Sequence, residues 1–190
     1  MFSVDFSEIE ILQRQENWDA MAAILSNAAC AVETAGADFL IICTNTMHKV
    51  APKIQQKLNI PILHIADAMA DALQRDGITR VGLLGTRFTM EQTFYRERLE
   101  SHGITVLIPE QEERDTVHNI IYSELCLGVI EHLSRTKYLS IVDSLARNGA
   151  EAVILGCTEI ALLIQQQHTN TPLYDTAKVH AEQAVAYALQ

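Results

Sequence analysis

Two similar stretches, "GADFLIICTNT" at residues 36–46 and "GAEAVILGCTE" at residues 149–159, indicate how this chain folds. Each contains a glycine, an apolar run of strand length, and then small polar residues. A second similar pair follows, "NIPILHIADAMADAL" at 59–73 and "NTPLYDTAKVHAEQAVAYAL" at 170–189. Because both pairs occur in the same order at nearly the same spacing, the sequence predicts two similar domains related by an internal repeat.

Apolar runs of strand length alternate with segments of helical period along the whole chain. The runs are 39–42, 61–65, 81–84, 104–108, 152–155 and 172–174. Strands separated by helices form parallel sheets through crossover connections. We therefore expect an α/β fold of two pseudo-symmetric domains, each a parallel sheet flanked by helices. The expected domains are residues 1–75 with 175–190, and residues 76–174.

The second half has an opening strand and helix for which the first half offers no counterpart. "GITRVGLLGTRFTMEQTFYRERL" at 77–99 reads as a strand and a helix, and Thr89 to Gln92 resembles a capping box that would open this helix. The first half starts at "FSVDFSEIE", residues 2–10, which resembles only the following strand at 104–108. The first domain is therefore expected to lack its leading β–α unit.

Composition excludes several classes of protein. The 190 residues include 24 acidic and 14 basic side chains, a formal net charge of −10. The basic residues form no stripe, which argues against nucleic acid or an anionic membrane as the partner. No apolar run approaches the roughly 18 residues of a membrane span. The first ten residues lack the features of a signal peptide, so the sequence predicts a cytoplasmic protein.

The four cysteines show neither the spacing of a zinc site nor that of a disulfide framework, so no metal is expected. Cys30 and Cys126 lie on apolar helix faces and are expected to pack in the core. Cys157 ends an apolar strand just before a helix. Backbone N–H groups and the helix dipole there would lower the pKa of a thiol and hold a substrate carboxylate. The alternative is that Cys157 is only a small core residue.

The repeat pairs Cys157 with Thr44 and pairs Gly156 with Cys43. Successive residues of a strand point to opposite faces. We therefore expect Thr44 and Cys157 to face one cleft, close enough to flank a single carbon atom, and Cys43 to point away from it.

Two motifs, "IICTNTMHK" at 41–49 and "VILGCTEIALL" at 153–163, resemble the paired signatures of the aspartate/glutamate racemase family. The similarity extends along nearly the whole chain. It implies an amino-acid racemase that needs no pyridoxal phosphate or other cofactor, acts on a small acidic amino acid by proton transfer at Cα, and forms a homodimer.

The resemblance also implies roles for individual residues. Cys157 as a thiolate would be the base for one enantiomer, and Thr44 would supply or relay the proton on the other side. The positions that contact substrate in the family correspond to Gln13, Asn45, Thr46 and Thr158.

Other functions fit the same pattern. One is a related cysteine-dependent reaction, such as hydantoin racemisation or decarboxylation of a substituted malonate. Another is a protein that binds amino acids without turning them over. The family also has a Gly-rich turn after its first strand, and the expected lack of this unit would impair catalysis.

Overall fold

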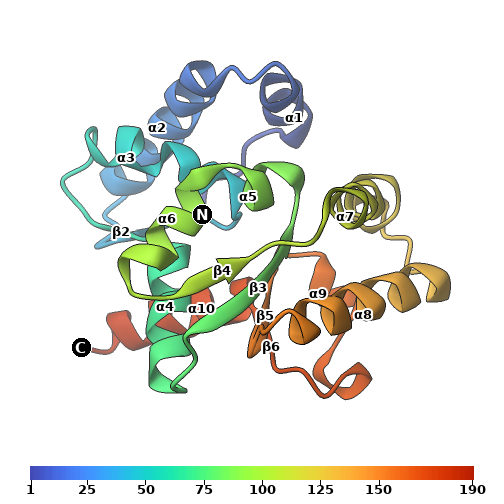
Figure 1. Ribbon diagram of the computed structural model, residues 1–190. Helices are drawn as coiled ribbons and strands as arrows, with labels where there is room; N and C mark the ends of the chain where they lie inside the picture. The colour runs from blue at the N-terminus through green and yellow to red at the C-terminus, as the bar shows by residue number, and fades with distance from the viewer. The chain divides into compact units, whose positions relative to one another are not determined.

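The computed structural model describes residues 1–190, which divide into two compact units (Figure 1). The first unit contains residues 1–42 and 47–64. The second contains residues 43–46 and 65–190. The short segment that follows the first strand of the chain, which carries Thr44, Asn45 and Thr46, therefore belongs to the second unit.

The first unit packs its helices around a two-stranded parallel sheet. Its elements are α1 (Phe6–Arg14), α2 (Trp18–Thr34), β1 (Leu40–Ile41), α3 (Ala51–Gln55) and β2 (Ile62–Leu63). A 3₁₀ segment, η1 (Thr46–Val50), precedes α3. The buried core includes Met21 and Ala22 of α2 together with Ile54 of α3.

The expected strand at residues 2–10 is wrong, because residues from Phe6 onward form α1. The Asp5 carboxylate accepts a hydrogen bond from the N–H of Ser7 at 2.8 Å and so caps the helix. Ile9 and Gln13, four residues apart, are the buried residues of α1. This is helical spacing, and it outweighs the similarity of the stretch to a strand.

The second unit contains a four-stranded parallel sheet with the order β4-β3-β5-β6. The strands are β3 (Arg80–Gly85), β4 (Thr105–Leu107), β5 (Ala152–Gly156) and β6 (Leu173–Asp175). The helices are α4 (Ile65–Arg75), α5 (Arg87–Glu91), α6 (Thr93–Ser101), α7 (Gln111–Ser123), α8 (His132–Arg147), α9 (Ile160–Leu163) and α10 (Thr176–Ala188), with 3₁₀ segments η2 (Leu125–Leu127) and η3 (Gln166–His168). Each of the six predicted runs overlaps a strand, and the α/β class is confirmed.

Helices cover both faces of this sheet, with α7 and α8 on one side and α4 and α10 on the other (Figure 1). The residues of β5 alternate between the two faces. Val153 and Leu155 pack with α7 and α8, whereas Ala152 and Ile154 pack with α4 and α6. Burial on both faces explains why this strand is apolar throughout instead of alternating with polar residues.

The repeat is confirmed at the level of strand register. Leu40 pairs with Ile62 in the first unit, and the equivalent Val153 pairs with Leu173 in the second. The N–H of Leu40 donates to the carbonyl of Pro61 at 2.9 Å, and that of Val153 donates to the carbonyl of Pro172 at 2.8 Å. The same two-stranded parallel element is thus built twice.

The two units divide the chain differently from the predicted domains. Helices α4 and α10 pack against each other within the second unit. The predicted first domain, 1–75 with 175–190, contains both helices, and the second was predicted as 76–174. Those boundaries stay a prediction.

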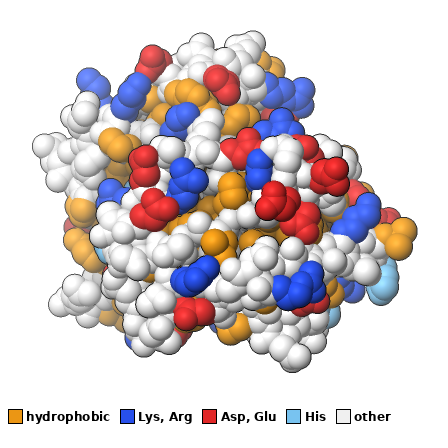
Figure 2. All heavy atoms as spheres, viewed as in Figure 1, with side chains coloured by type: hydrophobic (Ala, Val, Ile, Leu, Met, Phe, Trp, Pro, Cys, Tyr) orange, Lys and Arg blue, Asp and Glu red, His pale blue; other side chains and the backbone are white.

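The surface mixes charges of both signs. On the face drawn in Figure 2, Lys and Arg side chains are interspersed with Asp and Glu. None of the helices combines the length and the apolar composition that crossing a membrane requires.

The repeated glycines at the helix ends provide a test of the fold. Gly36 has φ of 90° and Gly149 has φ of 96°, a region that L side chains rarely adopt. Nothing lies within 4 Å of a Cβ added at Gly36. Gly36→Ala should therefore lower the free energy of unfolding by about 1 kcal/mol through the backbone alone, as measured by urea denaturation. Gly36→Asn should cost less, because Asn tolerates positive φ better than Ala. An equal loss for both variants would contradict this explanation.

Candidate active site

Small polar residues gather where the strands of the second unit end. Thr86 follows β3, Cys157 follows β5 and Thr176 follows β6. The carboxyl ends of parallel strands lie at the same edge of a sheet, which is where ligands bind in open α/β folds. The edge formed by β3, β5 and β6 is therefore the candidate site.

Asn45 is joined to this edge by buried hydrogen bonds. Its amide nitrogen donates to Thr176 Oγ1 at 2.9 Å, and the Thr176 hydroxyl donates to the carbonyl of Leu155 at 2.9 Å. Leu155 lies two residues before Cys157. The side-chain oxygen of Asn45 is buried and has no hydrogen-bond partner. Because an unpaired buried acceptor is costly, this oxygen is suited to a donor from a bound molecule.

Three buried threonine hydroxyls form a second polar cluster. Thr46 Oγ1 lies 3.3 Å from Thr86 Oγ1 and 3.3 Å from Thr89 Oγ1, and the latter two are 3.4 Å apart. The predicted capping role of Thr89 is wrong, because Thr89 lies inside α5 while Gln92 precedes α6 without a side-chain cap. Instead, the Thr89 hydroxyl helps to hold the segment that carries Asn45 and Thr46.

Glu159 is the immediate partner of Cys157. The half-buried thiol donates to Glu159 Oε2 at 2.9 Å. Burial, followed by the negative charge of Glu159, raises the pKa of Cys157 well above its usual value. The expected lowering by a helix terminus is wrong, and α9 after this residue has only four residues. Cys157 is therefore a thiol in the resting protein at neutral pH.

The remaining cysteines differ in exposure. Cys43 is exposed, whereas its neighbour Thr44 is half-buried. Cys30 packs against the core of the first unit, as expected. The expected core packing of Cys126 is wrong: it is exposed on η2, the short turn that follows α7.

The structure places five of the six predicted site residues in the second unit. Asn45 and Thr46 join the strand ends through side-chain hydrogen bonds to Thr176 and Thr86, and Thr158 is half-buried beside Cys157. Gln13 is buried on α1 of the first unit, so its role stays a prediction from sequence. Sequence reasoning missed Thr86, Thr89, Glu159 and Thr176 as site residues. Thr86, Glu159 and Thr176 lie within three residues after the end of a strand. Their position directly after predicted strands is the sequence signal that could have identified them.

Known proteins resemble this chain along almost its entire length. The Asp/Glu/Hydantoin racemase family matches residues 3–184. A crystal structure from Yersinia pestis, assigned as an Asp/Glu racemase, is 50% identical with a TM-score of 0.92, covering 99% of this chain and 82% of that one. An aspartate racemase homologue from Pyrococcus horikoshii is 35% identical with a TM-score of 0.86, covering 100% and 82%. The broad specificity amino-acid racemase RacX of Bacillus subtilis is 24% identical over 170 residues, which are 88% of this chain and 72% of RacX.

The order in which the cysteines are alkylated tests the environment of Cys157. At neutral pH with limiting iodoacetamide, the exposed Cys43 and Cys126 should react before Cys157, because the thiolate is the reactive form. Glu159→Gln should speed labelling of Cys157, since removing the carboxylate lowers the pKa of the thiol. Peptide mass spectrometry measures both, with Cys30 as the internal reference. Labelling of Cys157 ahead of the exposed cysteines in the unaltered protein would contradict the raised pKa.

Proposed function

Because the chain belongs to the Asp/Glu/hydantoin racemase family, we propose that it is a cofactor-independent racemase of small acidic amino acids. The observation that carries the proposal is the convergence of the two repeated signatures. Asn45 comes from the first and Cys157 from the second. The hydrogen bonds through Thr176 connect Asn45 to Leu155 of β5, two residues before Cys157. A substrate at this edge would meet polar groups from both halves of the chain.

Cys157 and Glu159 act together on one side of the substrate. The thiol proton passes to the Glu159 carboxylate, and the resulting thiolate removes the proton from Cα. In the opposite direction, the thiol donates its proton to the Cα carbanion. The hydrogen bond of 2.9 Å between Sγ and Oε2 supports this transfer.

Thr44 acts on the other side of Cα. A threonine hydroxyl stays protonated at neutral pH unless a neighbour removes its proton, so Thr44 serves more readily as a donor than as a base. One turnover moves a proton from Cα to the Cys157–Glu159 pair and another from Thr44 to Cα. Exchange with solvent restores both groups.

Substrate contacts complete the proposal. The unpaired Asn45 oxygen accepts a hydrogen bond from the substrate ammonium group, and Thr46 and Thr158 contact the substrate nearby. The small acidic side chain of the substrate and the cytoplasmic location are inferred from the sequence.

Exchange of the Cα proton in deuterated water, followed by NMR for L- and D-aspartate and for L- and D-glutamate, tests the reaction. Cys157→Ser should slow exchange from the enantiomer that faces this residue by at least about 100-fold. Thr44→Cys should speed exchange from the other enantiomer, because a thiol is more easily deprotonated than a hydroxyl. Cys43→Ser, a change at an exposed neighbouring thiol, is the control and should leave both rates unchanged.

Two outcomes would overturn the assignment. Binding of aspartate or glutamate without any exchange would identify a non-catalytic binding protein instead. Loss of exchange in Cys43→Ser, with no effect of Thr44→Cys, would place Cys43 rather than Thr44 in the proton path.

We also propose that the chain forms a homodimer through the apolar surface of Leu127, Leu133 and Leu162. These side chains are 72%, 75% and 59% exposed. Leu127 of η2 and Leu162 of α9 lie on elements that pack together, and the start of α8, which carries Leu133, is joined to α9 by a hydrogen bond from Arg135 Nε to the carbonyl of Leu163 at 2.8 Å. Burying such side chains between two copies is favourable by the hydrophobic effect. Light scattering should show a dimer that Leu133→Lys shifts towards the monomer. The exposed Val185→Lys on α10 is the control, and dimerisation unaffected by Leu133→Lys would exclude this surface.

A further inference from the structure

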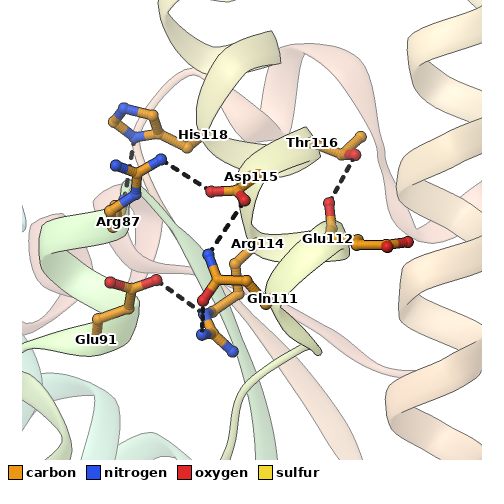
Figure 3. Close-up of polar contacts among 8 residues, drawn as sticks. All are labelled: Arg87, Glu91, Gln111, Glu112, Arg114, Asp115, Thr116 and His118. Carbon is orange, nitrogen blue, oxygen red and sulfur yellow. Dashed lines mark hydrogen bonds and ion pairs between the residues drawn. The ribbon is translucent and has the colours of Figure 1, made fainter.

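Helix α7 is attached to α5 by three polar contacts (Figure 3). The backbone N–H of Arg87 donates to His118 Nδ1 at 3.1 Å, and Arg87 Nη2 donates to Asp115 Oδ1 at 2.8 Å. Arg114 Nε donates to Glu91 Oε1 at 2.9 Å. Only the contact of His118 holds the main chain of α5, because the other two join side chains.

The held backbone lies between two members of the threonine cluster. Arg87 directly follows Thr86 and precedes Thr89 by two residues, and both hydroxyls lie 3.3 Å from Thr46 Oγ1. A shift of the Arg87 backbone would therefore move two of the three groups that surround Thr46. Thr46 in turn is the neighbour of Asn45, whose unpaired oxygen is the proposed acceptor for the substrate.

His118 can hold the Arg87 N–H only when its Nδ1 carries no proton, so the acceptor form is the neutral ring with the proton on Nε2. The ring lies beside Tyr122 of α7, with centroids 4.9 Å apart, and near Phe88 of α5, at 6.4 Å. These two rings shield one part of the imidazole from water.

Charges of both signs surround this ring. Burial and the positive charge of Arg87 lower the pKa of His118, while Asp115 and Glu91 act in the opposite direction. Arg114, bound to Glu91, is the remaining charged group of the α5–α7 contact. The balance keeps His118 neutral at neutral pH, as the hydrogen bond requires.

We propose that His118 is a positioning residue of the candidate active site. Its Nδ1 fixes the backbone at Arg87, and through Thr86 and Thr89 it fixes the Asn45–Thr46 segment that meets the substrate. This inference rests on the proposed racemase function. When His118 gains a proton, its Nδ1–H faces the N–H of Arg87 and the hydrogen bond between them is lost. Racemisation should therefore be slower at acid pH.

Two substitutions distinguish the effect of the hydrogen-bond acceptor at His118 from the effect of the size of its side chain. His118→Asn keeps an acceptor oxygen close to the position of Nδ1 but does not titrate, whereas His118→Leu removes the acceptor. His118→Leu should slow Cα proton exchange about tenfold, since small misplacements of contacting groups are costly. His118→Asn should have most of the Cα exchange rate of the unaltered protein. Because Asn does not titrate, this variant should also lose less of that rate when the pH is lowered. His132→Asn, at an exposed histidine of α8, is the control and should match the unaltered protein.

A second measurement does not depend on activity. The protection factor of the Arg87 amide is the exchange rate of an unprotected amide at the same pH divided by the rate that NMR measures for Arg87. It should fall as the pH is lowered and His118 becomes protonated. In His118→Leu the protection factor should be low at every pH, and in His118→Asn it should stay high. The unaltered protein could show no Cα exchange while the protection of the Arg87 amide still changes with the protonation of His118. The racemase proposal would then fail, but the role of His118 in holding the Arg87 backbone would be supported. Protection of the Arg87 amide that does not change when His118 is protonated would overturn the inference. A His118→Leu variant with the Cα exchange rate of the unaltered protein would overturn it as well.

Discussion

The buried hydrogen bonds from Asn45 through Thr176 to the carbonyl of Leu155 are the constraint on which the site depends. They hold a segment of the first repeat against the sheet of the second unit. A buried amide leaves this position only at the cost of unpaired polar groups, so the two signatures stay together. The threonine cluster around Thr46 fixes the same segment from the side of β3. The segment is thus held from two strand ends, and one acceptor, the Asn45 oxygen, is left unpaired.

The same edge of the sheet explains the unusual state of Cys157. A thiol in a polar, exposed helix terminus would ionise easily, but this one is shielded and faces a carboxylate. Glu159 helps to keep the thiol protonated at rest, and in the proposed mechanism it is also the group that receives this proton. If the Cys157 thiolate forms only when Glu159 takes the thiol proton, it has less opportunity to react with other electrophiles.

The sequence predicted the features that depend on local pattern. Apolar runs located all six strands. The repeated "GA" and Asn-x-Pro segments predicted that Leu40 and Val153 occupy equivalent positions, and the two residues have equivalent strand partners. Features that depend on distant contacts were not predictable. The role of Thr89 requires a partner 43 residues away in the chain, and the pKa of Cys157 requires the burial and the side-chain position of Glu159. Helix α1 was missed because its cap at Asp5 was outweighed by similarity to a strand.

The central claim is that Asn45, Thr44 and Cys157 meet one amino-acid substrate at the end of β5. A crystal structure of the Cys157→Ser variant with bound aspartate tests it most directly. The account predicts the substrate ammonium within about 3 Å of Asn45 Oδ1, and its Cα between the side chains at positions 44 and 157. Aspartate bound elsewhere, or an Asn45 oxygen paired with a donor of the protein itself while the substrate is bound, would contradict the claim.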